Sequence, residues 1–165
     1  MNGSDIAFER LYSQIHKEIY FLIYKIVLDQ SLAEDLVQDT FVTVWQKRHL
    51  IDQEKPIKNW VITIGIRLAQ SALRKRMLLG KYLWKVKDIF TSNVSTLDEG
   101  GLANDLLKEL PDGQRMVIVL IDLEGYSCEE TAKLLCLNIG TIRSRLNRAR
   151  QNLKAKYELA FKSKM

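Results

Sequence analysis

The chain has 165 residues, of which 47% are hydrophobic and 27% are charged, with a formal net charge of +5 and a pI near 9.2. This length allows one domain or two small ones, each with a modest apolar core. The two cysteines, Cys128 and Cys136, exclude a disulfide framework, and their spacing fits neither a zinc knuckle nor a CxxC redox pair. We expect both to be small buried residues of a protein in a reducing cytoplasm. The N-terminus shows no signal-peptide pattern, and no apolar run approaches the roughly 20 residues of a membrane span, so we expect no stable membrane insertion.

The charge is unevenly distributed along the chain. Basic clusters lie at 67–87 and 143–164, whereas residues 88–112 between them carry six acids and one lysine. Basic blocks on either side of an acidic joint suggest two separate contacts with a polyanion.

The first 50 residues contain two amphipathic helical patterns. The first begins at Ser4 or Asp5 and ends near Leu28, with apolar residues recurring at threes and fours. Ser31 and Glu34 predict a capping box that begins a second helix, which extends to about residue 48. The outer side of this second helix is acidic and rich in amides, with a valine at its centre: Asp35, Gln38, Asp39, Val42 and Gln46. Such a face could bind a partner helix, or it could serve solubility alone, since acids near a helix N-terminus also favour the helix dipole.

A polar loop over 47–59 precedes a third helix, predicted over 60–76. One side of this helix is broadly apolar, and the remaining arc carries an aromatic residue, polar residues and arginines: Trp60, Thr63, Arg67, Gln70, Ser71 and Arg74. An aromatic ring beside arginines can stack on an unpaired base while the guanidinium groups hold phosphates, although Trp60 could equally anchor the start of the helix. The cations that follow are predicted phosphate contacts: Arg74, Lys75, Arg76, Lys81, Lys85 and Lys87.

The region from 86 to 102 lacks periodicity and is predicted to be a flexible linker. A short helix is expected over 104–110. Residues 115–123 are apolar on nearly all sides, and we predict a helix there because the chain offers no second strand to pair with it. Gly125 is expected to end this helix.

Residues 127–153 predict two helices joined by a tight turn. Ser127 and Glu130 predict a capping box for the first helix, and Asn138 can cap the second. In the second helix an apolar stripe lies opposite a polar and basic side, the latter comprising Arg143, Ser144, Asn147, Arg148, Gln151 and Lys154. From Asn138 to the C-terminus there are eight Lys or Arg residues and one acid, Glu158. An ordinary solvated face mixes both signs, so this segment indicates a recognition helix that binds nucleic acid in a major groove.

The sequence offers little that could support catalysis or metal binding. His16 and His49 are each isolated, and Asp35 with Asp39 share a face far in sequence from any basic groove. We therefore expect no catalytic residue, no metal and no cofactor.

Four stretches together resemble the extracytoplasmic-function (ECF) class of bacterial RNA polymerase sigma factors: AEDLVQDTFVTVW (33–45), PIKNWVITIGIRLAQSALRKR (56–76), ELPDGQRMVIVLIDLEGYS (109–127) and EETAKLLCLNIGTIRSRLNRARQNL (129–153). Their order and spacing match the class over nearly the whole chain outside the linker. The resemblance implies an all-α fold of two small helical domains: sigma region 2 over 1–85, a linker over 86–102, and sigma region 4, with a helix-turn-helix, over 103–165.

The resemblance also implies roles for these surfaces. The helix with Asp35, Gln38, Asp39, Val42 and Gln46 is expected to dock on the β′ clamp helices of core polymerase, whose β subunit is a further expected contact. The next helix is expected to melt the −10 element and hold a flipped base, with contacts from Lys58, Asn59, Trp60, Thr63, Arg67, Ser71, Arg74, Lys75 and Arg76. The hairpin is expected to read the −35 element through Thr141, Arg143, Ser144, Arg145, Asn147, Arg148, Gln151 and Lys154. The class usually has an anti-sigma factor that masks both domains in the cytoplasm.

Three positions depart from the class. Arg67 stands where an asparagine is usual and Ser71 where an aspartate is usual, and together the two changes make the −10 helix more positive. Thr131 stands where an isoleucine is frequent, which predicts a small packing loss.

Other classes of protein fit the residues less well. A dimeric operator-binding regulator could use the same hairpin, but it would leave the acidic helix and the Trp60 helix without a role. A response regulator would need alternating strands before the hairpin. An enzyme acting on nucleic acid would need clustered acids, or a nucleophile beside a base.

Overall fold

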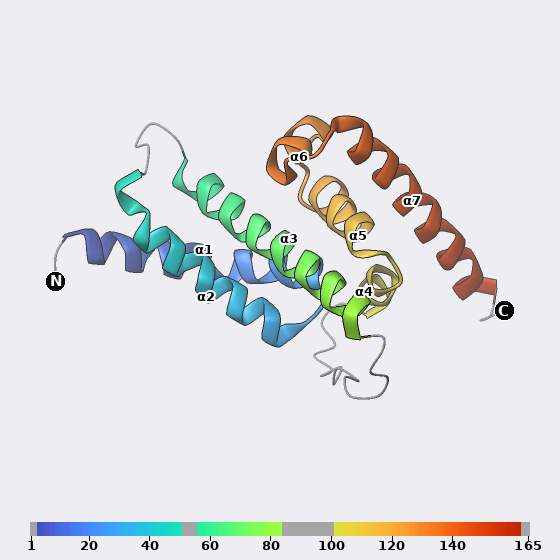
Figure 1. Ribbon diagram of the computed structural model, residues 1–165, viewed down its shortest axis with the longest axis horizontal. Coiled ribbons are helices and arrows are strands. Elements are labelled where there is room, and N and C mark those ends of the chain that lie inside the picture. Colours follow the sequence, from blue (N-terminus) through green and yellow to red (C-terminus); the bar gives the residue numbers. More distant parts are fainter. Residues whose placement is uncertain (1–2, 51–55, 84–100, 163–165) are drawn as a thin grey trace. The chain divides into compact units, whose positions relative to one another are not determined.

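The computed structural model describes residues 3–50, 56–83 and 101–162, and every regular element within these ranges is helical (Figure 1). The elements are α1 (Gly3–Val27), α2 (Gln30–Gln46), η1 (Arg48–Leu50), α3 (Ile57–Leu83), α4 (Gly101–Lys108), α5 (Asp112–Ile118), η2 (Val119–Leu123), α6 (Cys128–Leu135) and α7 (Ile139–Lys162). The chain divides into two compact units, Met1–Val94 and Ser95–Met165. The prediction of an all-α fold is confirmed.

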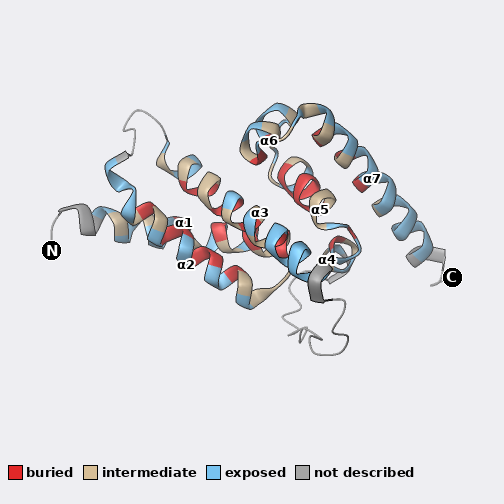
Figure 2. Ribbon diagram, in the orientation of Figure 1, coloured by how far each residue is buried: buried red, intermediate tan, exposed pale blue. Residues whose placement is uncertain are grey.

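The first unit is a packing of α1, α2 and α3, each of which contacts the other two. The buried positions lie along the sides where these helices meet, as Figure 2 shows. Gly65 allows α3 to approach closely, because a Cβ built there would lie 3.3 Å from Ile23 Cδ1 and 3.4 Å from Thr40 Oγ1. Thr40 is itself fully buried, and its hydroxyl donates to the Leu36 carbonyl at 2.6 Å.

The second helix begins two residues earlier than the sequence indicated, so the predicted Ser31–Glu34 capping box is wrong. Leu28 adopts a left-handed conformation (φ 52°) that ends α1 and turns the chain at once into α2. Asp29 is therefore the N-cap, and its carboxylate accepts from the Leu32 N–H at 3.0 Å. Ser31 lies within the first turn, and Glu34 accepts instead from Gln30 Nε2 at 3.1 Å.

The third helix is longer than the predicted span of 60–76 at both ends. It begins at Ile57, directly after Pro56, whose carbonyl accepts from the Asn59 N–H at 3.1 Å. Proline has a backbone φ suited to a helix start and no N–H to leave unpaired, so a helix can begin beside it.

The second unit is organised by α7, which packs on α4, α5 and α6. The apolar run 115–123 is helical, as predicted, but it changes from an α-helix to the π-helical turn η2 at Val119. The Glu124 N–H donates to the Val119 carbonyl at 3.0 Å, and Gly125, at φ +79°, ends the element as expected. Asp122, which pairs with Arg150 of α7, lies within this π-helical turn.

Several other predictions concern the ends of this unit. Most of the predicted linker over 86–102 lies outside the described residues. The helix α4 begins at Gly101, three residues before the helix expected at 104. The prediction that both cysteines are buried is wrong for Cys136, which is exposed, whereas Cys128 is half-buried. Cys136 ends α6 in a left-handed conformation (φ 51°), at the turn where the chain reverses. None of the helices that the structure describes has the length and apolar character that a membrane crossing requires.

Candidate nucleic-acid and partner-binding surfaces

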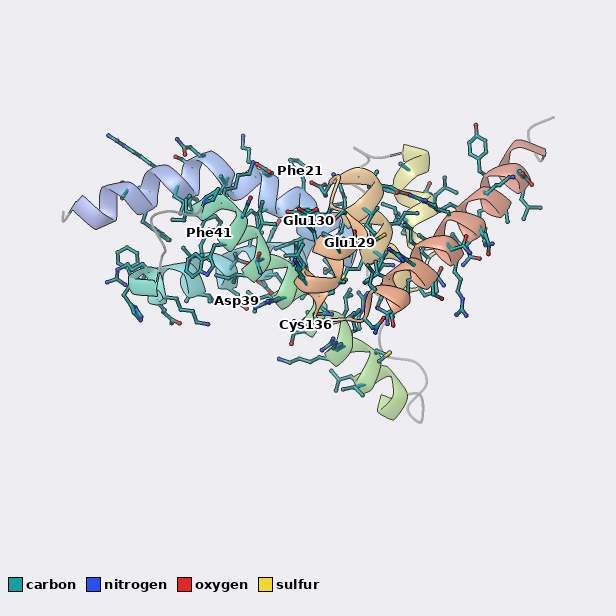
Figure 3. The ribbon with its side chains drawn as sticks, turned by 90° about the horizontal axis from the view of Figure 1, so that it is seen from above. Phe21, Asp39, Phe41, Glu129, Glu130 and Cys136 are labelled. Atoms are coloured by element: carbon teal, nitrogen blue, oxygen red, sulfur yellow. The ribbon has the colours of Figure 1, made fainter. Side chains whose placement is uncertain are left out.

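The outer face of α2 is formed by the five residues predicted from the sequence: Asp35, Gln38, Asp39, Val42 and Gln46. All five are exposed, and Val42, an apolar residue at their centre, has 54% of its surface accessible. Asp39 and Phe41, both labelled in Figure 3, show the two sides of the helix, with Phe41 buried and Asp39 exposed. Neither Asp35 nor Asp39 forms an ion pair with another residue of the described ranges. The face thus presents unneutralised acids around an exposed valine.

An aromatic cluster that sequence patterns did not reveal joins the N-terminal part of α1 to α2. The Phe8 ring lies 5.0 Å from the Trp45 ring, and the Tyr12 ring lies 4.7 Å from the Phe41 ring. The Arg48 guanidinium covers the Trp45 ring at 4.1 Å from its centroid, a cation–π contact. His16 stacks on Tyr12, with ring centroids 4.8 Å apart, so this histidine is engaged in packing.

A line of exposed side chains extends along the outer side of α3. Arg67, Ser71 and Arg74 recur at intervals of four and three residues, which places them on one side of the helix, and Trp60 lies half-buried two turns earlier on the same side. Thr63 is half-buried, and its hydroxyl donates to the Asn59 carbonyl at 2.7 Å. Asn59 and Lys75 are also exposed. An aromatic ring and two guanidinium groups therefore share one surface.

Two of the predicted α3 contacts are used within the unit. Lys58 Nζ pairs with Glu18 Oε1 of α1 at 2.8 Å. Arg76 Nη1 lies 3.4 Å from the Val27 carbonyl at the end of α1, where a cation suits the negative end of the helix dipole. Both side chains brace α3 against α1, which the helical pattern of α3 alone could not show.

The outer side of α7 carries six of the eight residues predicted for the hairpin, and we call these six the outer arc: Arg143, Ser144, Asn147, Arg148, Gln151 and Lys154. All six are exposed, while Ile142, Leu146 and Ala149 on the opposite side are buried. In Figure 2 α7 is exposed over most of its length, with its buried positions confined to one side.

The remaining two predicted residues lie outside this arc. Thr141 is half-buried. The Arg145 guanidinium lies against Gly113 of α5, since a Cβ built on Gly113 would be 3.1 Å from Arg145 Nη1. Arg145 therefore contacts the framework of its own unit, and the small residue at 113 is what makes room for it.

Side-chain bridges along its flanks attach α7 to the preceding helices. Arg150 donates two hydrogen bonds to Asp122 of η2, at 3.0 and 2.6 Å, and this contact raises the pKa of the Arg150 guanidinium. Asn152 donates to Gln114 at 2.9 Å, and Lys156 Nζ lies 2.8 Å from a carboxylate oxygen of Glu109. These partners are 28 to 47 residues apart, so helical periodicity carried no signal for them.

The N-termini of α6 and α7 have the predicted caps. The Glu130 N–H donates to Ser127 Oγ at 3.1 Å, and the Ser127 N–H donates to the Glu130 carboxylate at 2.8 Å. The backbone hydrogen bond from Ser127 is the main reason that the pKa of Glu130 is lowered, with its side-chain hydrogen bond second. Asn138 Oδ1 accepts from the Gly140 N–H at 2.7 Å at the start of α7. The backbone N–H groups at the start of each helix are thereby partly satisfied, as the sequence predicted.

Thr131 of α6 is fully buried, and its hydroxyl has no hydrogen-bond partner among the described residues. The same residues contain no group of three His, Cys, Asp or Glu side chains able to hold a metal ion.

Comparison with known proteins identifies both units. Residues 11–78 match the family model for Sigma-70 region 2, and residues 102–153 match that for Sigma-70, region 4. The chain is 27% identical over 166 residues to the ECF RNA polymerase sigma factor SigX of Bacillus subtilis, covering 93% of this chain and 84% of SigX. It is 30% identical over 161 residues to the ECF sigma factor SigE of Mycolicibacterium smegmatis, covering 90% of this chain and 60% of SigE.

A solved structure has a similar fold. The sigma factor RpoE of Bartonella quintana, crystallised with the anti-sigma factor NepR, is 28% identical with a TM-score of 0.68. The likeness covers 92% of this chain and 97% of RpoE.

Two all-helical units, one with a helix-turn-helix, define a DNA-binding protein of transcription. The chain belongs to the ECF family of RNA polymerase sigma factors. Proteins of this family direct transcription initiation by binding core RNA polymerase and promoter DNA, and they are not enzymes.

Proposed function

We propose that the outer face of α2 is the surface that binds core polymerase, by docking on the β′ clamp helices. The observation that carries this proposal is the pair of exposed acids, Asp35 and Asp39, which have no ionic partner within the described residues and surround an exposed Val42. Protein interfaces often have an apolar core that excludes water and a charged rim that steers the partner during association. The exposed Val42 and the acids around it, unpaired within the described residues, have this composition. Gln38 and Gln46 extend the same face with amide donors and acceptors.

The outer side of α3 is the proposed contact with the −10 element. Trp60 offers a ring on which an unpaired base can stack, and the exposed Arg67, Arg74 and Lys75 offer charge to the phosphates of the separated strand. Lys58 and Arg76 act here mainly as braces between α3 and α1, given their contacts with Glu18 and Val27. Asn59, Thr63 and Ser71 supply hydrogen-bonding groups along the same side.

The outer arc of α7 is the proposed reader of the −35 element. Its first turns carry Arg143, Ser144 and Asn147, which suit base edges in the major groove, and its later turns carry Arg148, Gln151 and Lys154, which suit phosphates as well as bases. Thr141 lies at the entry of the helix. Arg145 is the exception, because its contact with Gly113 assigns it to positioning the helix.

The proposed division of the chain is region 2 over 1–85, a linker over 86–102 and region 4 over 103–165. The protein acts in the cytoplasm, where core polymerase and its β subunit meet the promoter. The RpoE relative was crystallised with an anti-sigma factor, and we extend that class of partner to this chain.

Transcription in vitro with core polymerase on fragmented genomic DNA tests the proposal. Addition of the protein should produce transcripts with defined start sites that core polymerase alone does not produce. The DNA upstream of those sites should share two short motifs, near −10 and −35. Transcription without start-site selection would overturn the proposed function.

A further inference from the structure

One basic residue of the outer arc is paired with an acid from a different helix. Arg143 Nη2 lies 3.2 Å from Glu129 Oε1, and Glu129 belongs to the first turn of α6. Both side chains are well exposed, at 65% for Arg143 and 59% for Glu129. The pair therefore lies at the surface where α6 meets α7, on the side that carries the outer arc.

The other cations of α7 are arranged differently. Arg150 and Lys156 also have acidic partners, but these partners, Asp122 of η2 and Glu109, precede the helix-turn-helix, whereas Glu129 lies within it. Arg148 and Lys154, the remaining cations of the outer arc, form no ion pair with any residue of the described ranges. Within the described residues, Glu129 is thus the acid that pairs with a cation of the outer arc.

Glu129 and Glu130 are neighbours with separate tasks. The Glu130 carboxylate returns to the Ser127 N–H and completes the capping box, so helix capping does not require Glu129. Figure 3 labels both residues on α6. An exposed ion pair contributes little to stability, and a first-turn acid adds only a small interaction with the helix dipole, which does not require the contact with Arg143.

A carboxylate at this position has a definite effect on DNA binding. It repels nearby phosphates, and it neutralises a guanidinium that would otherwise bind any phosphate regardless of sequence. It also restricts the orientation of that guanidinium, because arginine is a planar fork whose donors point in fixed directions. When Nη2 of Arg143 is bound to Glu129, the guanidinium plane is held in one orientation. The other N–H donors of Arg143 can then reach a base only from that orientation.

We propose that Glu129 is a specificity-determining residue, which positions Arg143 to read a base edge of the −35 element and disfavours its contact with phosphates of unrelated sequence. The base partner that suits an oriented arginine fork is guanine, through its O6 and N7 acceptors. This inference rests on the proposed role of α7. Glu129 touches no base itself and acts through Arg143.

The test uses the complete protein bound to core polymerase and two promoter fragments found by the transcription experiment, one intact and one with its −35 motif scrambled. The ratio of the two affinities measures discrimination. Glu129→Gln should reduce this ratio about 5- to 10-fold, the size expected when an oriented arginine–guanine contact is loosened. The affinity for the scrambled fragment should rise, and its dependence on salt should steepen by about one phosphate contact, because Arg143 is then free to bind phosphate.

A double-variant cycle separates positioning from direct contact. In an Arg143→Ala background, Glu129→Gln should leave the ratio unchanged, since the residue through which it acts has been removed. If Glu129→Gln still lowers the ratio in that background, Glu129 contacts the DNA directly and the proposal is overturned. The same conclusion follows if the ratio of the single variant equals that of the unmodified protein.

Glu158→Gln is the matched control, because it removes the same charge from an exposed position later in α7 that has no ionic partner in the described part of the chain. It should leave discrimination unchanged, and an equal loss with this variant would attribute the effect to net charge and overturn the proposal. If the unmodified protein itself does not discriminate between the fragments, the −35 assignment of α7 fails and this inference fails with it. If the unmodified protein does discriminate between the fragments and Glu129→Gln does not change this discrimination, only the role of Glu129 is overturned.

Discussion

The outer face of α2 and the outer arc of α7 are both rows of exposed polar residues on helices whose opposite sides are buried, yet they relate differently to their own units. The α2 acids, Asp35 and Asp39, have no ionic partners among the described residues. Three cations of α7, Arg143, Arg150 and Lys156, form ion pairs with acids earlier in the chain: Glu129, Asp122 and Glu109. A face of the first kind can be recognised from one helix alone. In a face of the second kind, the residues left for a ligand are known only after the neighbouring helices have been placed.

The largest effect is expected at the α2 face. Asp39→Arg should abolish binding to core polymerase while leaving the helical fold intact, because it reverses a charge that nothing in the described unit neutralises. Reversing a charge at an interface costs roughly 2–5 kcal/mol, or about 30-fold and more in affinity. Competition for core polymerase against a labelled sigma factor measures the loss.

Glu9→Arg is a suitable control for this variant, because Glu9 is an exposed acid on α1 and lies outside the α2 face. It should bind core polymerase normally. If Asp39→Arg also binds normally, the docking face lies elsewhere and the contrast drawn between α2 and α7 loses its functional meaning.

The next effect distinguishes the two kinds of cation on α7. Arg148 lies on the outer arc without an ionic partner in the described residues, so Arg148→Ala should weaken binding to the −35 element by about 1–3 kcal/mol if it reads a base, and less selectively if it holds a phosphate. Arg150 is held by two hydrogen bonds to Asp122. Arg150→Ala should therefore change DNA binding less than Arg148→Ala, and it should lower thermal stability only modestly because the pair is largely exposed.

Binding of the two variants to an intact and a scrambled promoter fragment, together with their melting temperatures, provides the measurement. Should Arg150→Ala impair DNA binding more than Arg148→Ala, the outer arc has been drawn in the wrong place. The cations that form ion pairs within their own unit would then be the ones that bind DNA.

A smaller effect concerns α6, on which the position of α7 depends. The Thr131 hydroxyl is buried without a hydrogen-bond partner in the described residues, so Thr131→Val should raise the free energy of unfolding by about 1 kcal/mol at nearly constant volume. Thr40 is equally buried, but its hydroxyl donates to the Leu36 carbonyl. Thr40→Val should therefore not stabilise the protein, and thermal denaturation of both variants compares them directly. A loss of stability in Thr131→Val would show that its hydroxyl is satisfied.

The sequence predicted most of this architecture because most of it depends on short-range chemistry. The Ser127–Glu130 capping box and the Asn138 cap are decided within three residues, and both are present. The start of α2 was mistaken because Asp29 and Ser31 are both competent caps, and the left-handed turn at Leu28 decides between them.

Long-range contacts account for the remaining differences. Periodicity placed Arg145 among the DNA contacts, but its position is determined by Gly113, 32 residues earlier in the chain. Arg76 likewise lies beside the Val27 carbonyl, which belongs to another helix. Patterns within a helix specify which side is polar, whereas the partners of each polar residue depend on the tertiary fold. The contacts of the site residues with polymerase and DNA remain predictions.

The smallest effect is expected for α3. Its exposed Arg67 and Arg74, like Arg148 and Lys154 of the outer arc, form no ion pair within the described residues. Arg67 is exposed on the same side as Trp60 and Arg74, at a position where the family resemblance leads us to expect an asparagine. An arginine there adds a phosphate contact, which strengthens binding to any single strand and adds little base selectivity. Arg67→Asn should therefore reduce the salt dependence of promoter opening by about one phosphate contact, a change of about 0.7 in the logarithmic slope. Opening followed by fluorescence of a base analogue in the −10 element, over a series of salt concentrations, measures this slope.

Ser71→Asn, on the same side of α3 but without a change in charge, should leave the slope as it is. An unaltered slope in Arg67→Asn would mean that Arg67, although exposed, does not reach the DNA. The contrast between cations with and without an ion pair in their own unit would then apply to α7 alone.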